Sequence, residues 1–228
     1  MPAGSRRTQC APTRLMYCIC AAWLEADIMR DEYFGDKRDL VKWAAVIYLS
    51  KERKINNVLW VAYKRPSDFG NYSLSVDNAV TSFPKEVLKH FRHLHQIQGL
   101  ALDAGLRIDV FDREFKNPRE SYTNAVMTRI SSYDERLIVF LDPDTGIAPA
   151  SGYDFKHVTG GELCKIYESM HKGDLLVFYQ HARRDSDWVV KTKNEFCDAL
   201  NILCKDVHTI SGFTIAPDVV FFAVERHG

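Results

Sequence analysis

The chain has 228 residues, a length that suits one large domain or two small ones. Hydrophobic residues make up 46% of it and charged residues 26%, which is typical of a globular protein, and no apolar run is long enough to span a membrane. Lys plus Arg and Asp plus Glu number 30 each, so the net charge is zero. Binding to a nucleic acid would therefore depend on a local basic patch and not on an overall positive charge.

The six cysteines suggest no disulfide framework. None of them forms a Cys-x-x-Cys pair, and Cys18 and Cys20 are too close together for the usual spacing of a zinc site. The absence of a framework favours a reducing compartment, so we predict a cytoplasmic protein.

The N-terminal residues differ in character from the rest of the chain. Residues 1–15 are rich in Arg, Ser, Thr, Ala and Pro and show no periodicity. The apolar stretch at 15–24 weakly resembles a signal peptide, but no small-residue cleavage site follows it. We therefore predict a poorly ordered extension over residues 1–28 and a single folded domain over residues 29–228, with Met29 as a plausible native start.

In chain order, the residue pattern of the first half of the sequence predicts two helices and two strands. A helix is expected over 39–50, where Leu40, Trp43, Ala44, Ile47 and Tyr48 follow helical spacing. The apolar run at 57–63 predicts a buried strand, and the polar residues at 65–77 predict a loop. A helix over 84–102 and a strand over 106–111 follow.

The second half alternates between the same two kinds of element. Helices are expected over 122–131, 160–171 and 189–203, and strands over 137–141, 175–179, 207–210 and 219–224. Such alternation predicts βαβ units and one doubly wound, mainly parallel, Rossmann-like sheet. The last two strands are close in sequence, so we expect them to pair antiparallel, as in methyltransferase-like folds.

The strand at 137–141 runs directly into Asp142-Pro143-Asp144-Thr145-Gly146. Proline cannot donate to a sheet ladder, so the strand should stop near Asp142 and place both acids at its carboxyl end. Ligands of open α/β sheets bind at that edge. Asp142 could hold an amine or accept a proton, and Asp142 with Asp144 could instead hold a divalent metal ion.

A second polar motif, Tyr179-Gln180-His181-Ala182-Arg183-Arg184, ends the next strand. Parallel neighbours end at the same edge, so His181 should lie near the two acids and serve as a base or a metal ligand. Arg183, Arg184 and Lys156 could contact a phosphate or carboxylate group of the substrate.

The third motif, at 33–43, places Asp39 and Lys42 on one face of the first helix. Spacing alone predicts a surface ion pair worth tenths of a kcal/mol. The chain contains neither a Gly-x-Gly-x-x-Gly loop, nor a Gly-Lys-Ser/Thr loop, nor a Gly-x-Ser-x-Gly elbow.

The three motifs together resemble a widespread family of uncharacterised bacterial proteins, and the likeness covers roughly residues 29–226. More distantly, Gly35, Asp39 and Lys42 are similar to the N-terminal helix motif of ribosomal RNA adenine-N6 methyltransferases. Asp142-Pro143 is similar to the start of the Asp-Pro-Pro-Tyr motif of that family, which holds the target amine. This resemblance implies that Lys42, Asp39 and Gly70 line a pocket for S-adenosylmethionine.

Three functions follow from these motifs. The first is a methyltransferase-like protein that acts on a nucleic acid with S-adenosylmethionine. The second is a phosphodiesterase or nuclease in which Asp142, Asp144 and His181 hold Mg²⁺ or Mn²⁺. The third is a non-catalytic binding module, which is favoured by the absence of a glycine-rich loop after the first strand. The oligomeric state does not follow from the sequence.

Overall fold

The structure is a computed structural model that describes residues 37–64, 73–76, 79–82, 97–212 and 214–227. The predicted extension over residues 1–28 and most of the predicted helix over 84–102 lie outside these residues. For the two short segments at 73–76 and 79–82, only the backbone is described.

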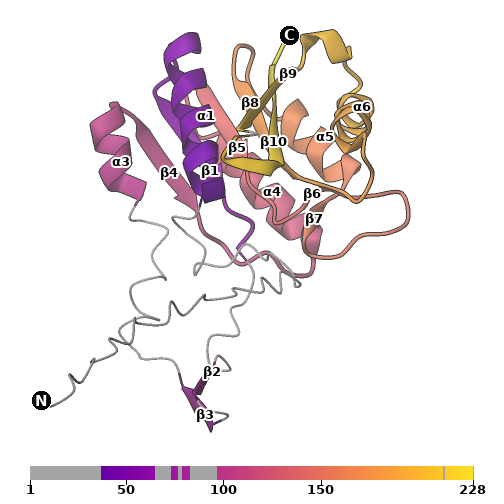
Figure 1. The fold of residues 1–228 in the computed structure, drawn as a ribbon. Helices are drawn as coiled ribbons and strands as arrows, with labels where there is room; N and C mark the ends of the chain where they lie inside the picture. Colours follow the sequence, from indigo (N-terminus) through magenta and orange to yellow (C-terminus); the bar gives the residue numbers. More distant parts are fainter. Residues whose placement is uncertain (1–36, 65–72, 77–78, 83–96, 213, 228) are drawn as a thin grey trace, which may run out of the picture.

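A six-stranded sheet forms the centre of the described part of the chain (Figure 1). Its strands are β1 (Asn57–Val61), β4 (Arg107–Phe111), β5 (Leu137–Leu141), β8 (Leu175–His181), β9 (His208–Gly212) and β10 (Ala216–Glu225). They lie in the order β4-β1-β5-β8-β10-β9. Strand β1 pairs parallel with β4 and β5, and β5 pairs parallel with β8, whereas β10 pairs antiparallel with both β8 and β9. The predicted mainly parallel sheet and its antiparallel final pair are therefore confirmed, and the arrangement is compatible with a Rossmann-like fold.

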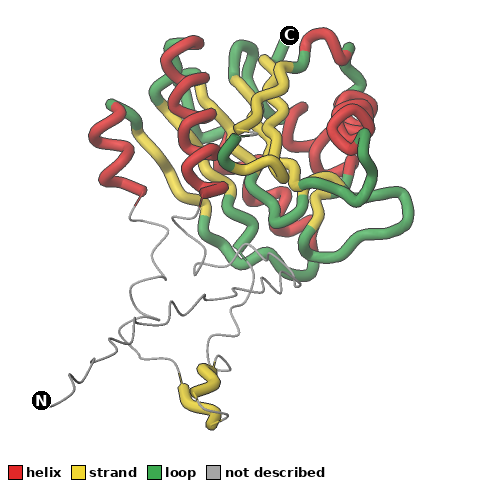
Figure 2. The backbone as a smooth tube through the Cα atoms, viewed as in Figure 1, coloured by secondary structure: helices red, strands yellow, loops and turns green. Residues whose placement is uncertain are grey.

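Helices cover both faces of this sheet, as the doubly wound prediction requires; Figure 2 shows the helices on either side of the strands. The helices are α1 (Lys37–Arg53), α3 (Ile97–Ala104), α4 (Arg119–Ile130), α5 (Gly160–Glu168) and α6 (Trp188–Leu200). Buried residues of α1 and α3 form one apolar cluster with one face of the sheet. Residues of α4, α5 and α6 form a second cluster with the opposite face. Strands β1 and β5 are buried along their whole length because both layers cover them.

Two pairs of short strands were not predicted. Strands β2 (Ser73–Val76) and β3 (Ala79–Ser82) form an antiparallel hairpin, part of it where a loop over 65–77 was expected. A signal was present, because residues 73–76 alternate polar and apolar side chains and two polar residues separate them from the second strand. Strands β6 (Gly146–Ile147) and β7 (His157–Val158) pair over only two residues each, too few to show any periodicity.

Helix α1 buries only part of the face that its apolar spacing predicts. Leu40 and Tyr48 are 64% and 59% exposed, although both belong to the predicted apolar stripe. The buried face carries Val46 and Leu49, and it also carries the charged pair Asp39 and Lys42. The expectation of a surface ion pair was therefore wrong, since the helix is rotated so that this pair faces the sheet.

One disulfide bond joins Cys197, near the end of α6, to Cys204 in the 3-10 turn η4 (Cys204–Asp206). The chain reverses direction at Asn201, which adopts a left-handed conformation with φ of 52°. This reversal brings the two Cα atoms to 5.6 Å, a separation suited to a disulfide. The expectation that the cysteines remain unpaired was wrong for this pair, and the cytoplasmic compartment, which was inferred from it, stays a prediction.

Within the residues that the structure describes, no helix is both long and apolar enough to cross a membrane.

Candidate functional site

The candidate site lies at the carboxyl ends of β1 and β5, where the chain changes the side of β1 on which it adds strands. From β1 the chain moves outward to β4 and then returns to β5 on the other side of β1. Crevices at the carboxyl ends of such neighbouring strands are the usual ligand sites of α/β sheets. Asp142 lies at this place, and its backbone N–H donates to the carbonyl of Val61 at the end of β1 at 3.0 Å.

Asp142 is the centre of a buried polar cluster. The Lys42 ammonium of α1 lies 2.9 Å from Asp142 Oδ2 and 2.8 Å from Asp39 Oδ1. The indole N–H of Trp60, on β1, donates to the same Asp142 Oδ2 at 2.8 Å. The exposed fractions of Asp39, Lys42 and Asp142 are 7%, 2% and 0%. Lys42 also lies over the ring of Tyr179, with 5.4 Å between Nζ and the ring centre.

The surroundings shift the pKa values of both members of the central pair. Burial raises the pKa of Asp142 to about 6, against the opposing effect of Lys42. Burial alone would lower the pKa of Lys42, but Asp142 and Asp39 outweigh it and raise that pKa above its usual range. Near neutral pH the cluster therefore holds an ammonium ion beside an ionised Asp142.

The second oxygen of Asp142 differs from the first. Oδ1 is buried and accepts no hydrogen bond within the described part of the chain, whereas Oδ2 has both Lys42 and Trp60. A buried carboxylate oxygen without a donor is costly. Such an atom at the ligand edge of a sheet is suited to accept a hydrogen bond from an amine.

Asp144 is also buried, at 6% exposed, in the loop that follows Asp142. The structure thus keeps the two predicted carboxylates at one sheet edge. Among the described residues, no three His, Cys, Asp or Glu side chains are grouped as metal ligands. Asp142 Oδ2 already has the Lys42 ammonium as its charged partner.

His181 lies at the end of β8 and forms a second polar cluster with residues that the sequence did not single out. Its Nε2 lies 3.4 Å from Asp218 Oδ2, and its Nδ1 lies 3.2 Å from the carbonyl of Ala182. Arg38, in the first turn of α1, also binds Asp218, with 2.9 Å from its Nε to Oδ2. Asp218 was missed because it enters from β10, the antiparallel strand, whose amino end reaches this edge.

The three predicted substrate-binding residues are placed differently from one another. Arg183 binds Glu195 through two nitrogens, at 2.8 and 2.7 Å, and donates to the carbonyl of Ile147 at 2.8 Å. Arg184 is exposed, and Lys156 is partly exposed. Arg184 and Lys156 thus remain accessible to an anionic group, whereas Arg183 would first have to release Glu195.

The chain after β1 differs from a glycine-rich loop. Tyr63 has a left-handed backbone with φ of 46°, and its ring is buried against Phe115 and Tyr122. Gly70, the remaining predicted cofactor residue, lies outside the described residues.

Asp112 directly follows β4, the strand beside β1. In dinucleotide-binding folds, an acid at this position binds a ribose hydroxyl.

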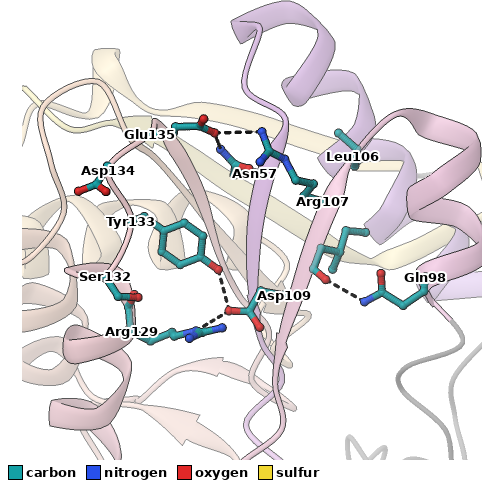
Figure 3. Close-up of a pocket in the computed structure, with 11 residues that line it drawn as sticks. Asn57, Gln98, Leu106, Arg107, Asp109, Arg129, Ser132, Tyr133, Asp134 and Glu135 are labelled. Atoms are coloured by element: carbon teal, nitrogen blue, oxygen red, sulfur yellow. Dashed lines mark hydrogen bonds and ion pairs between the residues drawn. The ribbon is translucent and has the colours of Figure 1, made fainter.

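A separate polar pocket lies at the opposite end of the sheet (Figure 3). Asn57 and Arg107, the first residues of β1 and β4, contribute to its lining. Two of its acids bind other lining side chains: Asp109 binds Arg129 and Tyr133 at 2.6 Å each, and Glu135 binds Asn57 and Arg107. This pocket lies away from the carboxyl edge and includes none of the predicted site residues.

Comparisons with known proteins assign no family to the chain: neither a scan of family models nor a search of curated proteins finds a match.

Proposed function

We propose that this chain is a methyltransferase-like protein that acts on an amine of a nucleic acid. The observation that carries the proposal is the contact between Lys42 and Asp142, whose charged atoms lie 2.9 Å apart. The two residues are a hundred positions apart in the sequence, and they belong to the two motifs that resemble adenine-N6 methyltransferases. If the two motifs form one site, their charged residues are expected to be in contact. Two unrelated segments of the chain would give no reason to expect that contact.

The strand order supports the same function. A parallel sheet with one antiparallel strand inserted near its edge is characteristic of methyltransferase-like folds, and β10 has this place between β8 and β9. Asp142 follows β5, the strand on the other side of β1 from β4, so both strands flank the crevice in which a ligand would bind.

The proposed chemistry uses the two oxygens of Asp142 separately. Oδ2 is held by Lys42 and Trp60, which fix the orientation of the carboxylate. Oδ1 would accept a hydrogen bond from the target amine and orient its nitrogen lone pair. With a pKa of about 6, Asp142 is mostly ionised at neutral pH and is suited to take a proton that the amine loses.

S-adenosylmethionine, when bound, would supply the methyl group. Asp112, which directly follows β4, would bind a ribose hydroxyl of such a cofactor. Lys42 and Asp39 would border the pocket from α1, although both already bind within the Asp142 cluster. Arg184 and Lys156 would contact the phosphates of the nucleic acid, because both are accessible to solvent at this edge.

Calorimetric titration and a methyl-transfer assay test the proposal together. The wild-type chain should bind S-adenosylmethionine and its demethylated product, and should transfer labelled methyl groups to RNA or DNA. Asp142→Asn should retain cofactor binding and lose about 10²-fold or more of the transfer rate. Asp198→Asn, a change to an exposed acid of α6, is the matched control and should leave the rate unchanged.

Two outcomes would contradict the proposal in different ways. If neither cofactor form gives heat with the wild-type chain, the methyltransferase function is wrong. If a nucleic acid binds but no methyl group is transferred under any condition, the chain is a binding module, a function consistent with the bulky Tyr63 after β1.

A further inference from the structure

The side-chain amide of Gln180 connects the two strand-end loops of the candidate site. Its oxygen accepts a hydrogen bond from the backbone N–H of Ile147 at 2.9 Å. Its nitrogen donates to the carbonyl of Thr145 at 2.9 Å and to the carbonyl of His181 at 2.8 Å. Gln180 is completely buried, and its acceptor and both of its donors are used.

Gly146 is shaped to fit this amide. Its φ of 106° is a conformation that favours glycine, and a Cβ atom placed there would lie 2.2 Å from Gln180 Oε1. The space that a side chain would need is filled by the Gln180 amide. The Gly of the Asp-Pro-Asp-Thr-Gly motif and the Gln of the Tyr-Gln-His motif are therefore two halves of one contact.

The same loop is also held from its other side. The backbone N–H and the hydroxyl of Thr145 both donate to the carbonyl of Lys156, at 3.1 and 2.8 Å. Asp142, Pro143 and Asp144 are buried although they lie beyond the end of β5. The loop therefore folds back against the sheet edge and does not project into solvent.

We propose that Gln180 is a positioning residue that fixes the loop carrying Asp142 and Asp144 against the end of β8. The inference rests on the proposed function only for the role of the Asp142 carboxylate. Because Gln180 binds both Thr145 and His181, it sets the distance between the two polar motifs of the site. The loop is thereby preorganised before any ligand arrives, which spares the cost of ordering it on binding.

Replacing Gln180 by leucine tests this role. The change keeps a side chain of similar volume and removes all three hydrogen bonds. The loop should then detach from the sheet edge, and water should reach Asp142. We expect the pKa of Asp142, followed by carbon NMR of its carboxyl group, to fall by about one unit toward its ordinary range. Affinity for S-adenosylhomocysteine should fall about tenfold or more, because the loop after β5, which borders the crevice proposed for the cofactor, loses its fixed position.

Gln98→Leu is the matched control. The Gln98 amide likewise donates to a backbone carbonyl, that of Ile108, at 2.8 Å, but it does so at the far edge of the sheet. This variant should leave both the carboxyl titration of Asp142 and the affinity for S-adenosylhomocysteine unchanged.

If Gln180→Leu does not fold, Gln180→Met replaces it. Methionine also makes none of the three hydrogen bonds and fills the space with a more flexible side chain, so the same two changes are expected. A folded variant in which loop amides exchange faster, while the titration of Asp142 and the affinity are unchanged, would overturn the positioning role. If the wild-type chain binds no S-adenosylhomocysteine, the proposed function fails, and the carboxyl titration alone still decides the role of Gln180.

Discussion

Lys42 is an unusual side chain, because it is buried with one ammonium group between two carboxylates. Taking charges out of water is costly, and the pair is stable only because each partner compensates the other. Removing Lys42 would leave Asp39 and Asp142 facing each other in a region that excludes water. The residue is therefore important for stability whatever ligand the site binds.

We predict that Lys42→Met lowers the free energy of unfolding by about 3–5 kcal/mol at neutral pH. The loss should be smaller at acidic pH, because Asp142 can then take up a proton in place of its lost partner. Urea denaturation at both pH values measures this. The control Lys172→Met changes an exposed lysine and should stay within about 0.5 kcal/mol of the wild type. A loss that does not depend on pH would argue against the charge pairing.

The pH dependence of stability should reveal Asp142 directly. Its folded-state pKa of about 6 lies above the value of about 4 expected in the unfolded chain. Between these values the folded state retains a proton that the unfolded state has lost, so the contribution of Asp142 to stability falls as the pH rises.

We therefore predict that the stability of the wild type relative to Asp142→Asn decreases from about pH 4 to about pH 6 and is constant above that range. Parallel urea titrations of the two proteins measure this difference. An increase over the same pH range would mean that the pKa of Asp142 is lowered in the folded chain.

For single residues, the sequence predicted where a side chain lies in the fold better than it predicted which other side chain it contacts. The apolar run before Asp142-Pro143 correctly located the buried carboxylate at a strand end. Spacing within α1 could not show that Lys42 reaches that carboxylate, since the contact depends on how the helix is rotated over the sheet. Asp218 carried no recognisable chemical signal, and Gln180 was assigned no role although it belongs to the Tyr-Gln-His motif, because the roles of both arise from contacts made across the sheet edge.

Among the elements, α1 shows where apolar periodicity is insufficient. The helix is apolar on more than one side, so spacing alone could not choose which side faces the sheet. Tertiary packing chose the side that carries Val46 and Leu49 and left Leu40 and Tyr48 exposed. Elements with a continuous apolar run, such as β5 at 137–141, were predicted with correct bounds because no choice of face arises when both faces are buried.

Two leucines of α1 test this assignment within one helix. Leu49→Ala should cost about 2–5 kcal/mol of stability, since Leu49 is buried and its removal leaves a cavity. Leu40→Ala should change stability by no more than about 0.5 kcal/mol, because Leu40 is 64% exposed. Thermal and urea unfolding of both variants provide the comparison, and equal losses would mean that the helix is rotated differently.

For the molecule as a whole, the alternation of strands and helices was sufficient to predict a doubly wound, mainly parallel sheet. It was not sufficient to predict the cross-link between α6 and η4. That disulfide depends on a chain reversal at Asn201, which has no clear signal in the cysteine spacing.

We predict that the Cys197–Cys204 disulfide stabilises the fold by about 2 kcal/mol, since it closes only a short loop in the unfolded chain. Cys204→Ser should show this loss in urea denaturation under oxidising conditions. Cys164→Ser is the control, because Cys164 is a free thiol. If a reducing agent leaves the stability of the wild type unchanged, the cross-link does not contribute to it.

The position of β10 has a consequence for the order in which the sheet forms. Strand β9 comes earlier in the chain than β10, yet in the sheet of the described residues its only hydrogen-bonded neighbour is β10. The amides of β9 therefore have no ladder to join in this sheet until β10 pairs with them. Hydrogen exchange should show β9 and β10 opening and closing together, as one cooperative unit at that edge of the fold.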